Sequence, residues 1–67
     1  MSGTNNVRAH RKLARITQAE LGNICGVSRQ SIVSVEGGDY APSVYLALRL
    51  ARALDTTVET LFGEEES

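Results

Sequence analysis

Hydrophobic residues recur along the chain every three or four positions rather than alternating, so the pattern predicts helices and no β-strand. Polar capping residues, glycines and one proline interrupt the pattern at short intervals. Five short helices joined by tight turns are expected over these ranges: Asn5 or Asn6 to Ala14, Gln18 to Cys25, Arg29 to Glu36, Val44 to Leu54, and Val58 to Phe62. The expected fold class is all-α.

The strongest helix start is Thr17, because Thr17 and Glu20 can cap each other's backbone N–H groups reciprocally. Gly26 can end that helix in a left-handed conformation, and Ser28 can cap the next one. The inward-facing positions of the five helices are expected to be Val7, His10, Ala14, Leu21, Ile24, Cys25, Ile32, Val35, Val44, Leu46, Ala47, Leu48, Leu50, Ala51, Leu54, Val58, Leu61 and Phe62.

Sixty-seven residues suffice for one small domain, with a core over about 5–62, a polar arm over 1–4 and an acidic tail over 63–67. The chain has one cysteine and one histidine, Cys25 and His10. These cannot form an intrachain disulfide or a four-ligand zinc site, so no metal or cofactor is expected. His10 has no nucleophile to serve and there is no glycine-rich phosphate loop, which argues against an enzyme.

The formal net charge of −1 conceals an uneven distribution of charge. Residues 1–35 carry five basic and one acidic side chain, a net of +4, whereas residues 36–67 carry two basic and seven acidic ones, a net of −5. A face for an anionic partner is therefore expected in the first half, and an end that repels anions in the second. No apolar run is long enough to cross a membrane, and no small-molecule cavity is expected in so thin a core.

The second and third predicted helices have the spacing of a helix-turn-helix unit. Gly22 is small enough for two helices to cross closely, and Gly26 can open the turn between them. The third helix would then face outward with Arg29 and Gln30 near its N-terminus, and these side chains can pair with guanine and adenine edges. The same residues could equally form a solvated polar face.

Three stretches in this order resemble the phage-repressor/Cro (Xre-type) helix-turn-helix family: 17–21 (TQAEL), 26–32 (GVSRQSI) and 35–38 (VEGG). The segment 40–51 resembles the loop and fourth helix of its short bacterial and archaeal regulators. The resemblance covers roughly residues 5–62. It implies a five-helix lambda-repressor-like DNA-binding domain.

The resemblance also implies roles for individual residues. Gln18 is expected to touch a phosphate and brace the recognition helix, and Ser28 to cap that helix and meet the DNA backbone. Bases would be read by Arg29, Gln30 and Ser34, with Val33 against a thymine methyl. Arg11 and Glu36 match a structural ion pair.

The loop after the third helix departs from the family, because Gly37 and Asp39 replace the Asn and Lys or Arg often found there. The backbone N–H groups of Gly37 and Gly38 remain candidate phosphate contacts, although Asp39 opposes them. Lys12 and Arg15 are further candidates for contact with the DNA backbone, or else part of a solvated face.

One such unit reads few base pairs, so a homodimer on two half-sites is expected. The candidate interface lies in the last two helices and comprises Tyr45, Leu46, Leu50, Val58, Leu61 and Phe62. The alternative is that all of these complete the monomer core.

The function expected is a sequence-specific transcriptional regulator that binds an inverted-repeat operator in double-stranded DNA, in the prokaryotic cytoplasm and nucleoid. The rival hypothesis is a protein-interaction module, antitoxin-like or an adaptor, for which DNA binding is secondary.

Overall fold

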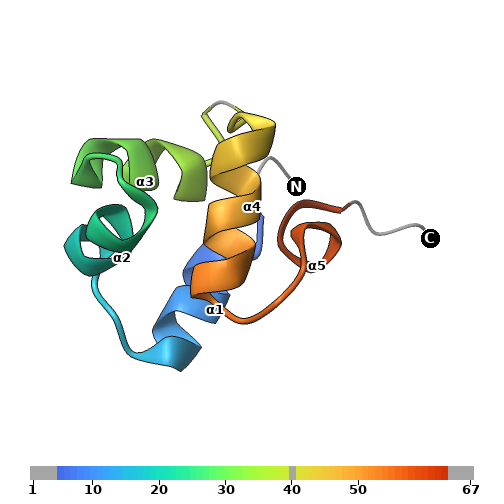
Figure 1. Cartoon of the computed structure of the whole chain (residues 1–67), viewed down its shortest axis with the longest axis horizontal. Coiled ribbons are helices and arrows are strands. Elements are labelled where there is room, and N and C mark those ends of the chain that lie inside the picture. The colour runs from blue at the N-terminus through green and yellow to red at the C-terminus, as the bar shows by residue number, and fades with distance from the viewer. Residues whose placement is uncertain (1–4, 40, 64–67) are drawn as a thin grey trace.

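A computed structural model describes residues 5–39 and 41–63, which form five α-helices (Figure 1). The helices are α1 (Val7–Ala14), α2 (Gln18–Cys25), α3 (Arg29–Glu36), α4 (Val44–Ala53) and α5 (Val58–Phe62). The described residues contain no β-strand, so the predicted fold class is confirmed. The predicted polar arm 1–4, Tyr40 and residues 64–67 of the predicted tail lie outside the described residues.

The predicted start and stop signals account for the helix ends. The Thr17 hydroxyl accepts the Glu20 N–H at 3.0 Å while the Glu20 carboxylate accepts the Thr17 N–H at 2.7 Å, which completes the capping box. Gly26 ends α2 with φ +75°, and the Ser28 hydroxyl caps α3 by accepting the Ser31 N–H. The fourth helix ends at Ala53, one residue before the predicted end.

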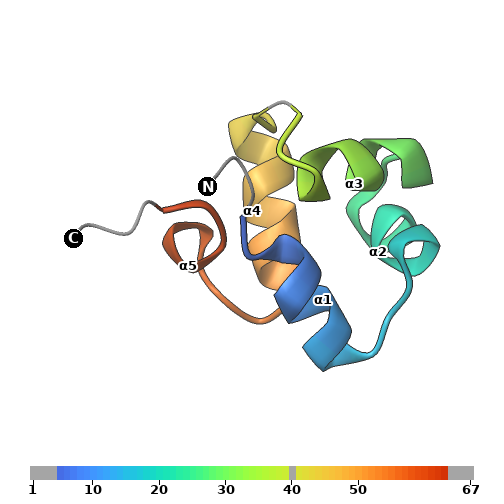
Figure 2. The same cartoon turned by 180° about the vertical axis from the view of Figure 1, so that it is seen from behind.

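The helices pack around a single small core. In Figure 1, α4 stands in front of α1, with α2 and α3 on one side and α5 on the other, and Figure 2 shows the reverse face with α1 in front. The central side chains are Leu21, Ile32, Leu50, Leu61, Val7, Val35 and Cys25, all less than 2% exposed. Each of the five helices contributes at least one of them, so α3 is held from behind while its outer face stays open.

The close crossing of α2 and α3 depends on Gly22. A Cβ atom placed there would lie 2.8 Å from the backbone oxygen of Val27, closer than a carbon and an oxygen can approach without a shift. Glycine has a lower helix propensity than alanine, by about 1 kcal/mol. This cost is offset because glycine lets the turn between α2 and α3 pack directly against α2. This confirms the predicted role of Gly22 at the helix crossing.

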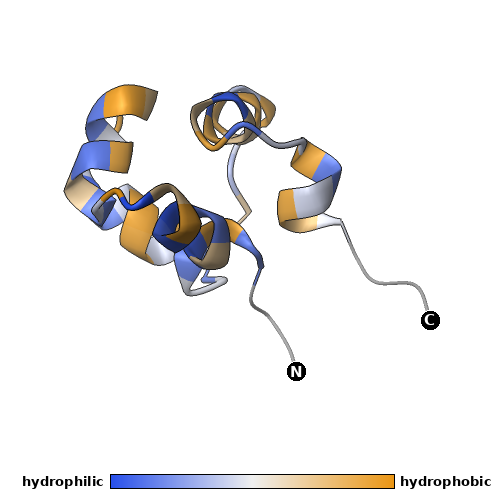
Figure 3. Ribbon diagram, turned by 90° about the horizontal axis from the view of Figure 1, so that it is seen from below, coloured by the Kyte–Doolittle hydropathy of each residue, from blue (hydrophilic) through white to orange (hydrophobic). Residues whose placement is uncertain are grey.

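Four positions expected to face inward are exposed: Ala14, Ile24, Val44 and Leu48. Val44 is 74% and Leu48 51% exposed, because α4 turns Leu46, Ala47, Leu50 and Ala51 toward the core instead. Seen end on, α4 is hydrophobic around much of its circumference (Figure 3). Periodicity could not select its inner face for that reason, and packing against α2 and α5 decides it.

No helix within the described residues is long and apolar enough to span a membrane.

Candidate nucleic-acid interface

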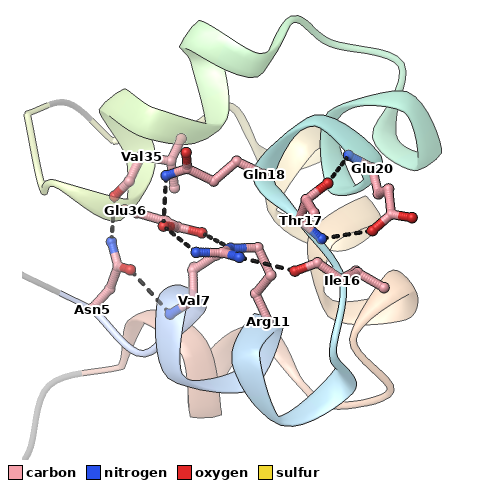
Figure 4. A network of polar contacts seen from close by, with 9 residues as sticks. All are labelled: Asn5, Val7, Arg11, Ile16, Thr17, Gln18, Glu20, Val35 and Glu36. Atoms are coloured by element: carbon pink, nitrogen blue, oxygen red, sulfur yellow. Dashed lines mark hydrogen bonds and ion pairs between the residues drawn. The ribbon is translucent and has the colours of Figure 1, made fainter.

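Glu36 is the centre of a buried polar network that fixes α3 (Figure 4). Its carboxylate accepts from Arg11 Nε at 2.6 Å and from Arg11 Nη2 at 3.3 Å. Gln18 Nε2 donates to the same carboxylate at 3.1 Å. The predicted Arg11–Glu36 ion pair is thus present, and Gln18 braces the end of α3 as expected. One carboxylate thereby joins α1, α2 and α3.

Backbone groups extend this network. The third Arg11 nitrogen, Nη1, donates to the Ile16 carbonyl at 2.9 Å and so holds the turn between α1 and α2. Asn5 donates through Nδ2 to the Val35 carbonyl at 2.8 Å, and its Oδ1 accepts the Val7 N–H. Asn5, rather than Asn6, therefore caps α1 with its side chain. Each end of α1 is tied to a neighbouring element.

The outer face of α3 carries the residues predicted to read bases. Arg29 and Gln30 are exposed in its first turn, while Val33 and Ser34 are half-buried one turn further on. Ser28 precedes them as the cap residue and is also exposed. Because the network behind α3 is buried, these side chains project from a rigid helix, a favourable arrangement for reading the edges of base pairs.

Beside this face lies an open hollow of about 520 Å³. Its lining includes four basic side chains, Arg11, Lys12, Arg15 and Arg29, and also Gln18 at the start of α2. The lining contains no carboxylate. Of its four basic side chains, Arg11 is the one that forms an ion pair with Glu36. The hollow can therefore accept an anion, with Lys12, Arg15 and Arg29 supplying positive charge that no carboxylate of residues 5–39 or 41–63 pairs with.

Arg15 reaches this hollow from a strained backbone. It follows α1 with φ +62° and ψ +40°, the left-handed region that disfavours residues with a Cβ. The short connection from Ala14 to Gln18 requires this sharp reversal, and the sequence places no glycine there.

A sequence model of the helix-turn-helix family, of the Xre and lambda-repressor type, matches residues 7–61. The chain belongs to this family. The family comprises DNA-binding transcriptional regulators and not enzymes. The predicted family resemblance is therefore confirmed.

Relatives of this regulator occur in archaea and bacteria. An uncharacterised helix-turn-helix-type transcriptional regulator of Methanothermobacter thermautotrophicus is 52% identical over 61 residues, covering 90% of this chain and 88% of that protein. The Bacillus subtilis regulator YgzD is 39% identical, with 92% and 94% covered. The crystal structure of the P22 c2 repressor in complex with a synthetic operator superimposes with a TM-score of 0.81 at 35% identity, covering 88% of this chain and 91% of that one. The predicted lambda-repressor-like architecture is confirmed by this match.

Two of the predicted phosphate contacts are corrected by the structure. The Gly37 N–H donates to the Val33 carbonyl at 3.0 Å, and the Gly38 N–H donates to the Val35 carbonyl at 3.1 Å. Both groups are consumed in ending α3, so neither is free to bind a phosphate. The exposed Asp39 follows directly and would repel one. The positive charge near α3 comes instead from the hollow at its other end.

The predicted dimer interface is also corrected in part. Leu50 and Leu61 are 0% exposed and Leu46 is 9% exposed, because all three pack into the core of the monomer. They have no surface to offer a partner. Val58 and Phe62 are half-buried against the same core, and only Tyr45, at 77% exposure, projects freely from the monomer.

Cys25 is a packing residue in this fold. It is 1% exposed, and burial raises the pKa of its thiol despite the nearby Arg49, whose charge lowers it. Arg49 Nη1 donates to the Cys25 carbonyl at 3.2 Å and so joins α4 to the end of α2. A protonated, buried thiol has little reactivity.

The strain at Arg15 leads to a testable prediction. Arg15→Gly is expected to raise the free energy of unfolding by about 0.5–1 kcal/mol, because the relief of left-handed strain exceeds the added chain entropy of glycine. The same variant is expected to bind DNA more weakly and to lower the slope of log affinity against log salt by about 1. Chemical denaturation and fluorescence anisotropy measure the two effects.

Asp55 provides the matched control. It also has a left-handed backbone, with φ +56°, but it follows α4 and does not line the hollow. Asp55→Gly should stabilise the fold less, because aspartate tolerates the left-handed region better than arginine does, and it should not weaken DNA binding. A DNA affinity that Arg15→Gly leaves unchanged would show that the strained arginine is not a DNA contact.

Proposed function

We propose that the protein is a sequence-specific regulator of transcription that binds double-stranded DNA as a homodimer, with α3 in the major groove of each half of an inverted repeat. The observation that carries this proposal is the pairing of two surfaces. Arg29 and Gln30 project from a braced helix, and a hollow rich in positive charge opens beside them. Base edges and a phosphate are the partners that fit these neighbouring surfaces.

The base-reading set comprises Arg29, Gln30, Val33 and Ser34. Arg29 can donate two hydrogen bonds to guanine O6 and N7, and Gln30 can pair with adenine N6 and N7. Val33 can meet a thymine methyl group, whereas Ser34 can donate to or accept from either base. Contacts of this kind distinguish one sequence from another, so α3 is where specificity would arise.

The backbone-binding set comprises Lys12, Arg15, Gln18 and Ser28. Lys12 and Arg15 neutralise phosphate charge from the hollow. Gln18 uses one amide hydrogen on Glu36 and keeps its second for a phosphate oxygen. Contacts to phosphates hold the protein in register without reading sequence. The net charge of −1 keeps binding to arbitrary DNA weak, which increases the share of affinity that Arg29 and Gln30 must provide.

A homodimer is proposed because one such α3 helix contacts few base pairs, and a two-fold arrangement doubles the length of DNA that is read. The P22 c2 repressor, which shares the fold, was crystallised with an operator. Since the relatives include regulators from archaea and a bacterium, we place the protein in the prokaryotic cytoplasm, with access to the nucleoid.

Selection from a library of random-sequence DNA duplexes tests the proposal. Protein-bound duplexes are recovered, amplified and sequenced over several rounds. The expected product is an inverted repeat whose half-sites are about 10 base pairs apart, centre to centre. Enrichment of a single half-site would exclude the homodimer, and no enrichment would instead favour a protein-interaction module.

A further inference from the structure

The outer side of α4 carries three exposed hydrophobic side chains that lie outside the core formed by the described residues. Val44, Tyr45 and Leu48 are 74%, 77% and 51% exposed, respectively. Val44, Leu48 and the exposed Arg52 are spaced four residues apart and share one row of the helix, with Tyr45 beside them. We call these four residues the α4 strip. Single exposed hydrophobic residues are ordinary on protein surfaces, whereas a row of them is a candidate contact surface.

We propose that the α4 strip binds the α4 strip of a second copy, with the two helices antiparallel and the two-fold axis beside Leu48. This inference rests on the proposed function, because it names the surface through which the DNA-binding homodimer forms. In this register Leu48 meets Leu48 of the second copy, and the Val44 end of one strip lies over the Arg52 end of the other.

Two α4 strips are complementary to each other when the helices are antiparallel but not when they are parallel. The antiparallel register places the Arg52 guanidinium over the Tyr45 ring of the second copy, a cation–π arrangement, and its methylene groups over Val44. The two Arg52 residues lie four residues on either side of the axis, about 12 Å apart at 1.5 Å per residue. That separation exceeds the screening length of about 8 Å at physiological salt. Parallel helices would instead place the two arginines together.

The extent of the strip predicts a weak interface. Its three hydrophobic side chains expose on the order of 300 Å² per copy, well below the roughly 800 Å² per partner of a standard stable complex. The pair should therefore be sparsely populated in dilute solution. It becomes stable when an inverted repeat holds two copies side by side, because the local concentration then rises steeply.

The position of the strip is compatible with this role. α4 lies on the face of the molecule opposite α1 (Figures 1 and 2), and α1, α2 and the connection between them supply most of the hollow. The strip residues do not line that hollow, so a second copy can occupy α4 without covering it. The negative half of the chain thus contains the contact between copies, and the positive half contains the proposed DNA surface.

Disulfide trapping tests the proposal. Leu48→Cys places a thiol beside the axis, and mild oxidation on the selected inverted-repeat duplex should yield a covalent dimer. Leu13→Cys is the matched control, because Leu13 is a 79% exposed leucine on α1, outside the strip. We expect Leu48→Cys to cross-link at least about tenfold faster than Leu13→Cys. The buried Cys25 should leave the unmodified chain monomeric, and circular dichroism checks that each variant is folded.

A second pair of variants tests the register. Val44→Cys alone should cross-link poorly, because its two copies lie about 12 Å apart and a disulfide requires Cα atoms within about 7 Å. Val44→Cys mixed with Arg52→Cys should form the mixed dimer. Equal cross-linking of Leu48→Cys and Leu13→Cys would overturn the interface, and efficient self-cross-linking of Val44→Cys would overturn the antiparallel register.

The experiments distinguish a wrong dimer surface from an absence of sequence-specific DNA binding. If selection enriches an inverted repeat but Leu48→Cys does not cross-link on it, the homodimer uses another surface and the α4 strip is wrong. If selection enriches nothing, oxidation of Leu48→Cys at high protein concentration without DNA still tests the strip, and a monomeric product there overturns it.

Discussion

Glu36→Ala is expected to lower the free energy of unfolding by about 3–5 kcal/mol. The Arg11 and Glu36 side chains are only 11% and 4% exposed, so removal of the carboxylate strands a buried guanidinium charge and the Gln18 amide. A domain of this length has a total stability of about 3–10 kcal/mol, so the variant should lose a large fraction of its stability and unfold at a much lower urea concentration. Circular dichroism during urea denaturation measures the change.

Two further variants separate the buried pair from general charge effects. Glu59→Ala removes a carboxylate from the exposed surface of α5 and should change stability by about 0.5 kcal/mol or less. Arg11→Met combined with Glu36→Leu replaces both charges with apolar groups and should be more stable than Glu36→Ala alone. A loss below about 1 kcal/mol in Glu36→Ala would mean that the network does not hold the three helices together.

Arg29→Ala is expected to weaken binding to the selected duplex by about 1–3 kcal/mol, about 5- to 150-fold in Kd. The loss arises because a guanine would keep two acceptors with no donor facing them. Gln30→Ala should cause a loss of the same order at an adenine. Gln30→Ala should barely alter binding to a scrambled duplex, whereas Arg29→Ala should weaken it by a smaller factor than on the selected duplex, because the hollow loses one positive charge. The preference for the selected sequence should therefore fall in both variants. Fluorescence anisotropy on the two duplexes measures both quantities.

Lys12→Ala provides the contrast for this experiment. Lys12 lines the hollow and can neutralise a phosphate, so its removal should weaken binding to selected and scrambled duplexes by the same factor. Its slope of log affinity against log salt should also fall by about 1. If Arg29→Ala and Lys12→Ala behaved alike on both duplexes, α3 would not be the element that reads sequence.

Much of the fold could be predicted because its helix boundaries depend on local chemistry. The Thr17–Glu20 capping box, the left-handed Gly26 and the Ser28 cap all act within a few residues, and each was identifiable from spacing. Family resemblance added the Arg11–Glu36 pair, whose partners are 25 residues apart. Periodicity alone gives no reason to join two such distant charges.

Other features depend on tertiary packing and could not be predicted in this way. α4 is apolar around much of its circumference, so only its neighbours decide that Leu50 is buried and Leu48 exposed. The Gly37 and Gly38 N–H groups are occupied because of how α3 ends, a detail that composition does not contain. The left-handed backbone at Arg15 likewise depends on how α1 is joined to α2, a connection that contains no glycine to adopt it.

The central claim is that this protein recognises a DNA sequence through α3, and a specificity ratio tests it most directly. The affinity of the unmodified protein is measured for the selected inverted repeat and for a scrambled duplex of equal length and composition, at about 0.15 M salt. We predict that the selected duplex binds at least about 10³-fold more tightly. A ratio near one at the same salt concentration would contradict the account.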